Sequence, residues 1–263
     1  MTIIQSKNKL SINQSKYYLS QVAKSCMSAI RSVMYAGSNF NCPCCDDSFS
    51  KFLPAGINQR PNAECPKCFS LERHRLLWLY LKNKTNLLSD KLKILHFAPE
   101  FQLYRLINRL PNIDYLTADL SAPRVMVNMD ITNIPFEDNS FDVILCNHVL
   151  EHIPDDAKAM KELYRVLKPG GWSLLQVPLD KNLEETFEDP NIVSEEDRLK
   201  FYGQKDHVRQ YGLDYKNRLE QAGFKVNVEN YIEQLGTTVA EKCRLVSEDG
   251  NSEDIYLCTK SVI

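Results

Sequence analysis

The chain has 263 residues, of which 43% are hydrophobic and 25% charged, and its formal net charge is −2. This length suits one large domain with a small addition, and the slightly acidic balance argues against a dedicated nucleic-acid-binding protein. We find no apolar stretch near the 18 residues of a transmembrane helix and no pattern of a secretory signal. We therefore expect a cytoplasmic protein, in which clustered cysteines bind a metal more often than they form disulfides.

Residues 1–41 contain five Lys or Arg residues and no Asp or Glu. Within them, residues 17–37 place apolar side chains at helical spacing, and Gly37 is a typical stop signal. The pattern predicts a basic N-terminal helical arm that packs on the body of the protein. A helix that binds a membrane surface or a partner is the alternative, because one face is basic.

Two C-x2-C pairs follow the arm, Cys42 with Cys45 and Cys65 with Cys68, and nineteen residues separate them. Each such turn directs two thiolates at one point, and tetrahedral Zn²⁺ takes four thiolates at about 2.3 Å. Four protein ligands leave no open position, so we expect a structural zinc ion, with iron as the alternative metal. Cys44 lies inside the first pair and is a possible substitute ligand. Residues 42–90 are thus predicted to form a zinc knuckle with a linking helix over 70–83, which begins at Ser70 as N-cap.

Strands and helices alternate from residue 91 to the end of the chain. Strands are expected over 92–97, 114–119, 125–129, 140–147, 172–177, 224–230 and 254–260, and helices over 100–110, 155–167 and 213–223. A KPGG sequence at 168–171 is expected to end the second of these helices. Such alternation predicts an α/β fold with a mostly parallel sheet, helices on both faces and an antiparallel edge formed by the last two strands. Residues 91–263 would form this domain.

Ligands of such sheets bind beyond the carboxyl ends of the strands, often at a glycine-rich turn after the first strand. Here that turn has no glycine and contains His96, Ala98, Pro99 and Glu100. Asp119 ends the second strand nineteen residues after Glu100, a spacing typical of an acid that binds ribose hydroxyls. A further acid, Asp130, follows the third strand.

Residues 130–178 resemble the central region of class I S-adenosylmethionine-dependent methyltransferases, of the type that includes ubiquinone and menaquinone C-methyltransferases. The resemblance lies in a D-x4-P-F-x4-F-D run, a VLEH sequence and an RVLKPGG sequence, and it extends over about residues 92–230. It implies a Rossmann-like seven-strand sheet with its last strand antiparallel, and S-adenosylmethionine as cofactor. A bacterial subset of the family is similar over the cysteine knuckle, SLERHRLLWLYL, LHFAPE and the late DHVR as well.

The resemblance also implies roles for individual residues. Asp119, with Leu120 beside it, would hold the ribose, and Asp130 and Ile131 would flank the adenine. The two residues that end and follow the fourth strand, Asn147 and His148, would face the methyl-transfer centre.

The first turn departs from the family pattern, in which an acidic residue precedes G-x-G-x-G. We expect a rebuilt cofactor site, because S-adenosylmethionine has no phosphate that requires a glycine nest. Glu100 would pair with the ammonium group of its amino-acid tail, and His96 would take part in the same site. A cofactor-free fold and a site for another nucleotide are the alternatives.

A long connection over residues 179–212 separates the fifth strand from the last helix. Residues 180–197 hold eight acids and one Lys, which predicts a substrate cap, with a solvated acidic loop as the alternative. His207 is the first candidate for a catalytic base and His148 the second, with Asp206 and Tyr211 beside His207.

The sequence therefore predicts methyl transfer to an oxygen or nitrogen atom of an acceptor, most plausibly a small molecule or a glycan. An RNA methyltransferase is one alternative, although the acidic cap argues against a nucleic-acid partner. A non-catalytic binding scaffold that contains zinc is the other. The sequence leaves the acceptor and the oligomeric state open.

Overall fold

The structure is a computed structural model that describes residues 25–56, 59–246 and 253–262. Residues 25–34 are helical, which agrees with part of the predicted arm. Residues 17–24 of the predicted helix lie outside the described residues. The helix ends before Gly37, because a strand already begins at Ala36.

The larger body of the protein is built on a seven-stranded sheet with the order β10-β11-β9-β8-β5-β6-β7. Its strands are β5 (Leu92–Phe97), β6 (Ile113–Asp119), β7 (Val127–Asn128), β8 (Phe141–Asn147), β9 (Leu167–Gln176), β10 (Lys225–Glu229) and β11 (Ile255–Thr259). Strands β5 to β9 pair in parallel, whereas β11 pairs antiparallel with both β9 and β10. The predicted α/β fold with a mostly parallel sheet and an antiparallel edge is confirmed.

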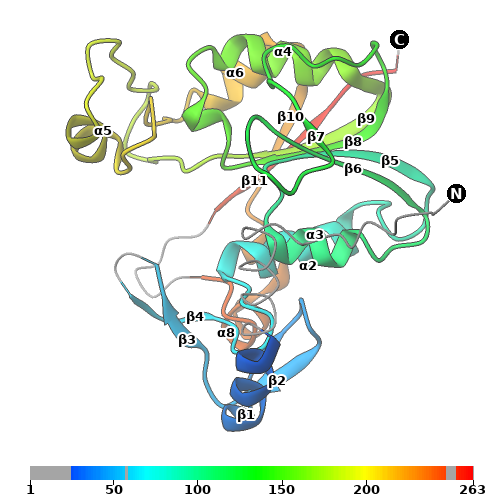
Figure 1. Ribbon diagram of the computed structural model, residues 1–263, viewed down its shortest axis with the longest axis vertical. Coiled ribbons are helices and arrows are strands. Elements are labelled where there is room, and N and C mark those ends of the chain that lie inside the picture. The colour runs from blue at the N-terminus through cyan, green and yellow to red at the C-terminus, as the bar shows by residue number, and fades with distance from the viewer. Residues whose placement is uncertain (1–24, 57–58, 247–252, 263) are drawn as a thin grey trace, which may run out of the picture.

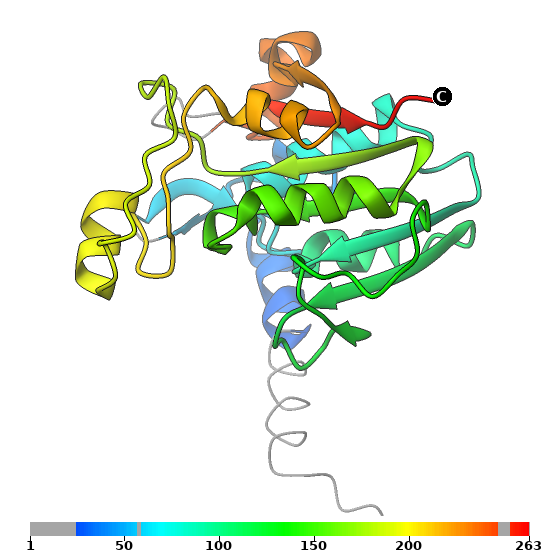
Figure 2. The ribbon, with the colours of Figure 1, turned by 90° about the horizontal axis from the view of Figure 1, so that it is seen from above.

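Helices cover both faces of this sheet (Figure 1). On one face lie α4 (Asp156–Val166) and α6 (Tyr215–Gln221), and on the other lie α2 (Glu72–Lys84) and α3 (Phe101–Ile107). Figure 2 shows α4 lying along the strands. Alternate side chains of the central strands therefore enter two different cores.

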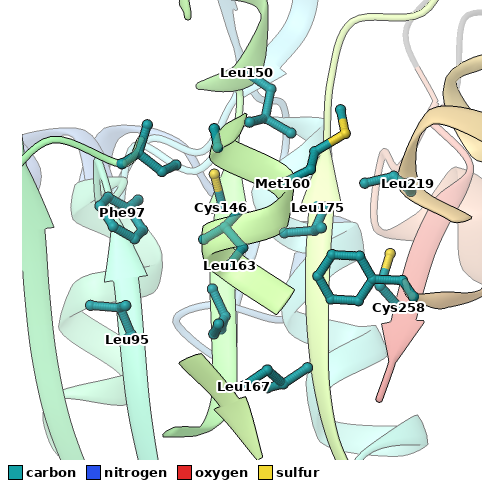
Figure 3. Close-up of a cluster of buried hydrophobic side chains, with 14 of the residues drawn as sticks. Leu95, Phe97, Cys146, Leu150, Met160, Leu163, Leu167, Leu175, Leu219 and Cys258 are labelled. Carbon is teal, nitrogen blue, oxygen red and sulfur yellow. The ribbon is translucent and has the colours of Figure 1, made fainter. Parts of the chain in front are cut away.

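Strand β5 shows this alternation of side chains between the two cores most clearly. Leu95 packs in the core under α4, and Ile94 packs in the core with α2 and α3. Met160 and Leu163 of α4 lie over the strands in Figure 3, and both are fully buried. Burial of one such side chain contributes about 2 kcal/mol. The two cores thus hold the central strands, and with them the strand ends at the carboxyl edge, in fixed positions.

The strand that contains KPGG begins earlier than expected. Helix α4 ends at Val166, and β9 starts at Leu167 and includes KPGG, whereas the sequence analysis placed that strand from Trp172. The reason is local, because a residue that precedes proline disfavours the helical conformation, and Lys168 precedes Pro169.

The cysteine-containing region lies below the face covered by α2 and α3 (Figure 1). It consists of two small hairpins, β1 (Ala36–Cys42) with β2 (Asp47–Phe49) and β3 (Leu53–Ala55) with β4 (Arg60–Glu64). The short helices α7 (Tyr231–Leu235) and α8 (Thr237–Lys242) come from the C-terminal part of the chain, and α8 contacts β1.

Residues 179–212 leave the carboxyl edge of the sheet and return to it. They contain α5 (Glu195–Tyr202), which stands away from the sheet in Figure 1. Isolated bridges join Leu179 to Tyr211 and Phe187 to Gln210, so the two arms of this segment are paired with each other. We call residues 179–212 the cap.

Among the described residues, no helix combines the length and the apolar character needed to cross a membrane.

Candidate active site and four-cysteine centre

The four predicted metal ligands come together at one point. The sulfur atoms of Cys42, Cys45, Cys65 and Cys68 all lie within 4.8 Å of one another. The Cys42 and Cys68 sulfurs are 3.5 Å apart and those of Cys45 and Cys65 are 3.8 Å apart. Four thiolates at about 2.3 Å from a tetrahedral zinc ion would be separated by roughly 3.8 Å, so the donor set fits this metal.

Cys44, the spare cysteine of the first pair, is directed elsewhere, and its thiol faces the carbonyl of His74 at 3.6 Å. Ser70 lies against the cluster instead of capping α2, with its hydroxyl 3.2 Å from the sulfurs of both Cys42 and Cys68. The prediction that Ser70 is the N-cap was wrong, because the chain must still close the cysteine turn at this point, and Leu71 is the N-cap.

Arg75 of α2 joins the cysteine-containing region to the C-terminal part of the chain. It is fully buried, and its guanidinium donates to the carbonyls of Ala63 and Ser70 on one side and of Cys243 and Arg244 on the other. A buried cation needs compensating charge. A metal bound by four thiolates carries a net negative charge and would supply it.

The candidate cofactor site lies at the carboxyl edge of the central strands β5, β6 and β8. Two residues at this edge, Ala98 after β5 and His148 after β8, have positive φ angles of 44° and 54°. Non-glycine residues adopt this region at a cost in free energy, and such strain concentrates at functional sites. The rebuilt first turn is therefore tightly folded although it contains no glycine.

Glu100 is the best-defined group in that turn. One carboxylate oxygen, Oε2, lies 3.2 Å from Nε2 of His96, whose Nδ1 in turn lies 2.7 Å from the hydroxyl of Tyr115. The other oxygen, Oε1, is buried and has no hydrogen-bond partner among the described residues. Burial alone would raise the pKa of Glu100, but His96 and the nearby His74 together lower it to about 2. Glu100 is thus an ionised carboxylate with one oxygen free to bind a cation.

Asp119 and Leu120 lie at the end of β6. Oδ1 of Asp119 accepts the backbone N–H groups of Ser121 and Ala122, which fixes the carboxylate. Leu120 is 69% exposed, an unusual position for a large apolar side chain, and so offers a surface for a flat ring.

Asp130 and Ile131 lie just beyond β7. Oδ1 of Asp130 accepts the N–H of Thr132 at 2.8 Å, and this bond is the main reason that the pKa of Asp130 is lowered. Ile131 is buried beside it. The pair presents an anionic acceptor next to an apolar wall, which is the combination that an adenine with an amino group requires.

Asn147 and His148 lie at the end of β8. Asn147 is buried, and its Oδ1 has no hydrogen-bond partner among the described residues. His148 lies between two carboxylates, with Nδ1 3.6 Å from Glu151 and Nε2 3.5 Å from Glu253. Burial alone would lower the pKa of His148, but Glu151 and Glu253 raise it to about 10.

These groups match the chemistry of S-adenosylmethionine. Two buried oxygens without partners, Oε1 of Glu100 and Oδ1 of Asn147, suit an ammonium group, and the fixed carboxylate of Asp119 suits a ribose diol. The exposed face of Leu120 and the wall at Ile131 suit an adenine. The residues at this edge of the sheet therefore fit S-adenosylmethionine, the cofactor that the sequence implies.

A cavity of about 820 Å³ opens next to this edge. Its wall includes Arg73 of α2, the start of the cap, and Glu253, the residue that also contacts His148. Nε of Arg73 is buried and has no hydrogen-bond partner among the described residues. The cavity is thus linked to His148 through Glu253, and its wall has charged groups of both signs.

His207, the first candidate for a base, lies in the cap beside the residues that follow β8. It is buried, its Nδ1 lies 3.2 Å from the carbonyl of Tyr202, and burial lowers its pKa. Its ring packs edge-on against His152, with 4.8 Å between the ring centroids. Asp206 contacts His152, with its carbonyl 3.2 Å from Nδ1 of that ring.

Tyr211 and Arg209 fasten the cap to the body of the protein. Tyr211 is fully buried and its hydroxyl donates to Asp156 at 2.6 Å. Arg209 donates to Glu188 and to the carbonyls of Leu150, Ile153 and Pro154. The catalytic role of Tyr211 stays a prediction, and the contact in the structure is an anchor of the cap.

Sequence reasoning missed three residues of this region, Arg73, Glu151 and Glu253. Glu151 stands inside the VLEH sequence, directly after the fourth strand, and that position was an available signal. Arg73 and Glu253 come from α2 and from the segment before β11, and no local pattern links those segments to the sheet edge.

Known methyltransferases are similar to the part of the chain that contains strands β6 to β9. Residues 105–175, from α3 to β9, match the family described as "Methyltransferase domain". The demethylmenaquinone methyltransferases of Staphylococcus epidermidis and Staphylococcus haemolyticus are 50% and 52% identical to the chain over 46 residues. That segment is 18% of the chain and 19% of each relative, so the chain spans about a fifth of the length of the curated relatives it matches.

Two solved structures can be compared with the whole domain. A structure described as a methyltransferase from Bacillus halodurans is 20% identical, with a TM-score of 0.44, over 71% of this chain and 99% of that one. The 1,6-didemethyltoxoflavin-N1-methyltransferase of Burkholderia thailandensis is 12% identical, with a TM-score of 0.47, over 73% of this chain and 78% of that one.

The match over residues 105–175 covers β6, β7 and β8, and thus the residues that follow β8, where the strand-end groups converge. Residues 105–175 of the chain thus match a methyltransferase domain, and the similarity to the curated relatives is confined to 46 residues.

Proposed function

We propose that the protein transfers the methyl group of S-adenosylmethionine to an oxygen or nitrogen atom of a polar small molecule or glycan. The observation that carries this proposal is Glu100, an ionised, buried carboxylate whose Oε1 has no hydrogen-bond partner among the described residues. It stands at the turn where the family binds the amino-acid end of the cofactor.

Each part of the cofactor has a proposed partner in the chain. Glu100 binds the ammonium group, and His96 holds Glu100 in place through the 3.2 Å contact to Oε2. Asp119 orients the ribose, while Asp130 and Ile131 bind the adenine. When bound, the cofactor supplies a methyl group on a sulfonium, which a nucleophile displaces in line.

The cavity next to His148 is the proposed acceptor site. Its volume of about 820 Å³ lies in the range of small-molecule sites. Its wall combines three cations and three acids with apolar side chains of α2 and the cap: Arg60, Arg73, Lys181, Glu72, Asp180, Glu253, Leu76, Phe187 and Phe201. Charges of both signs favour an acceptor with several hydroxyl or charged groups over an apolar one.

The acceptor must also lose a proton when the nucleophile is a hydroxyl. The groups available for this are Glu151, His152 and His207, which lie after β8 and in the cap within 4.0 Å of a neighbour or in ring contact. His148 contacts Glu151, but with a pKa of about 10 it is already protonated. We propose that proton removal takes place at these three side chains, with Asp206 positioning His152.

We further propose that the four cysteines bind a structural zinc ion. The sulfur separations support this assignment, and the four donors leave no open position for a substrate.

The proposed cofactor site is tested by calorimetric titration with S-adenosylhomocysteine, which retains the ammonium group. We expect micromolar binding, weakened tenfold to a hundredfold in Glu100→Gln, because hydrogen bonds to charged groups contribute roughly 1.5–3 kcal/mol. Asp119→Asn should also weaken binding. Asp114→Asn is the matched control, because Asp114 is an exposed carboxylate near the opposite end of the same strand β6.

A folded wild-type protein that binds no S-adenosylhomocysteine would contradict the proposal and would favour a non-catalytic scaffold. Equal binding by the wild type and by Glu100→Gln would refute the role of Glu100 alone. With binding established, turnover is measured as release of S-adenosylhomocysteine with polyols, sugars and amines, and with RNA as a separate class of acceptor.

A further inference from the structure

Three potential metal ligands converge beside the proposed methyl-transfer centre. Glu151 and His152 belong to the short 3₁₀ helix Leu150–His152 after β8, and His207 comes from the cap, 55 residues later in the chain. One ligand atom from each of the three lies within 4.8 Å of the other two. The backbone N–H of Val208 donates to the carbonyl of Glu151, which holds the two segments together.

Two of the three residues, Glu151 and His207, each have a buried polar atom without a hydrogen-bond partner among the described residues. Glu151 is 1% exposed and His207 is 3% exposed. Oε2 of Glu151 and Nε2 of His207 have no hydrogen-bond partner among the described residues. A buried polar atom without a partner costs about 1–3 kcal/mol, so two of them in residues whose potential ligand atoms converge indicate a missing ligand.

The far side of each imidazole is held in the way that metal-binding histidines require. Nδ1 of His207 lies 3.2 Å from the carbonyl of Tyr202, and Nδ1 of His152 lies 3.2 Å from the carbonyl of Asp206. A carbonyl oxygen can only accept a hydrogen bond, so Nδ1 of each ring carries the hydrogen and the lone pair is on Nε2. Nε2 of His152 faces Glu151 at 4.0 Å.

We infer that Glu151, His152 and His207 form a second metal site, which binds a divalent transition-metal ion and takes part in the proposed methyl transfer. Two imidazoles and one carboxylate suit Zn²⁺, Mn²⁺, Co²⁺ or Fe²⁺ and leave positions open for an acceptor. Ligands at about 2.1 Å from a metal stand roughly 3.4 Å apart, so small side-chain rotations would close the site.

The position of this site suggests its role, which rests on the proposed function. Glu151 contacts His148, and His148 contacts Glu253 in the wall of the cavity. Coordination of an acceptor hydroxyl would lower its pKa, and its proton would pass to water. The oxygen then attacks the methyl carbon, the C–O bond forms as the C–S bond breaks, and the electron pair of that bond stays on sulfur. This assignment favours O-methylation.

The test is a titration with Mn²⁺ of protein that carries one zinc ion per chain, with all excess zinc removed, and binding is followed by loss of the electron paramagnetic resonance signal of the free Mn²⁺. Four thiolates that already hold zinc do not bind Mn²⁺, so the titration reports the second site alone. We expect one Mn²⁺ per chain, with the dissociation constant raised at least tenfold in Glu151→Gln and in His207→Gln. Glu185→Gln is the matched control, because it removes an exposed acid from the same cap.

His152→Gln provides a second variant if His207→Gln does not fold, since the His152 side chain is 31% exposed. Added Zn²⁺ and Co²⁺ should displace the bound Mn²⁺. Absence of binding by all three ions in the folded wild type, or equal affinity in the wild type and the Glu151 and His207 variants, would overturn the second site. Binding of S-adenosylhomocysteine is measured separately, so a failure of the methyltransferase proposal remains distinguishable from a failure of the metal site.

Discussion

His74 is a single residue whose burial limits the stability of the protein in acid. It is 3% exposed, and its Nδ1 accepts the backbone N–H of Leu71 at the start of α2. Burial and the neighbouring Arg73 lower the pKa of His74 to about 4, whereas a histidine in an unfolded chain has a pKa near 6.5. Between these two values the unfolded chain binds a proton that the folded protein does not.

The free energy of unfolding therefore decreases as the pH falls from about 6.5 towards 4. Above this range His74 does not affect the pH dependence of stability. Linkage gives a loss of roughly 2 kcal/mol between pH 7 and pH 5. We expect His74→Asn, which keeps an acceptor for the Leu71 N–H, to lose correspondingly less. Urea unfolding of both proteins at the two pH values, in zinc-saturated buffer, measures this difference, and equal losses would contradict it.

Residues of the site were predictable where the chemistry is local in sequence. The paired cysteines, Glu100 and Asp119 follow from spacing and from their position after predicted strands. The grouping of Glu151 with His207 was not predictable, because it depends on how the cap folds back over the residues after β8. The role of Glu253 is likewise set by tertiary packing, which no local pattern encodes.

At the scale of elements, the buried side chain of Arg209 is a main anchor of the cap. Arg209 is 2% exposed, and it donates to three backbone carbonyls that follow β8 and to Glu188 within the cap. Arg218 of α6 adds ion pairs to Asp156 and Glu188 from outside the cap. The cap is therefore tied to the segment that carries Glu151.

We expect Arg209→Met to loosen this element more than the rest of the fold. The substitution removes the donor to three backbone carbonyls and one of the two arginine partners of Glu188, which costs about 3–5 kcal/mol. Hydrogen exchange should rise in residues 179–212 and after β8, with smaller changes in β5. Lys200→Met on the exposed side of α5 is the control. Uniform exchange across the sheet and the cap would argue against a local anchor.

The order of elements followed from the sequence better than their ends did. Periodicity identified the strands of the sheet because buried parallel strands are continuous apolar runs. The start of α2 at Glu72 and of β9 at Leu167 were missed, because Ser70 serves the cysteine cluster and KPGG joins a strand. Helix α5 was not expected at all, since its eight residues have a weak apolar face.

At the scale of the whole molecule, the four-cysteine centre and the sheet share one packed core. Phe49 and Phe52 of the cysteine-containing region belong to the same buried cluster as Leu76 of α2 and Ile94 of β5. The boundaries predicted at residues 41 and 90 stay a prediction, and this shared core means that the stability of one part affects the other.

Removal of the metal should therefore destabilise the entire protein. We expect Cys65→Ser, or zinc removal by a chelator, to lower the melting temperature and the free energy of unfolding by several kcal/mol, since bound structural zinc contributes folding energy. Cys44→Ser is the matched control, because that thiol faces the His74 carbonyl and lies outside the cluster. Differential scanning calorimetry of each variant, with its zinc content measured in parallel, tests this prediction. Unchanged stability of Cys65→Ser would show that the four-cysteine centre is dispensable for folding.

Arg75 has a consequence for the evolutionary history of the protein. Its guanidinium satisfies carbonyls of the cysteine-containing region and, more than 160 residues later in the chain, those of Cys243 and Arg244. A descendant that lost the chain through α2 would leave the later carbonyls without the Arg75 donor, and one that lost the later segment would leave this buried cation without two of its acceptors. We therefore expect the cysteine-containing region and the segment around Cys243 to have been inherited together rather than exchanged as independent domains.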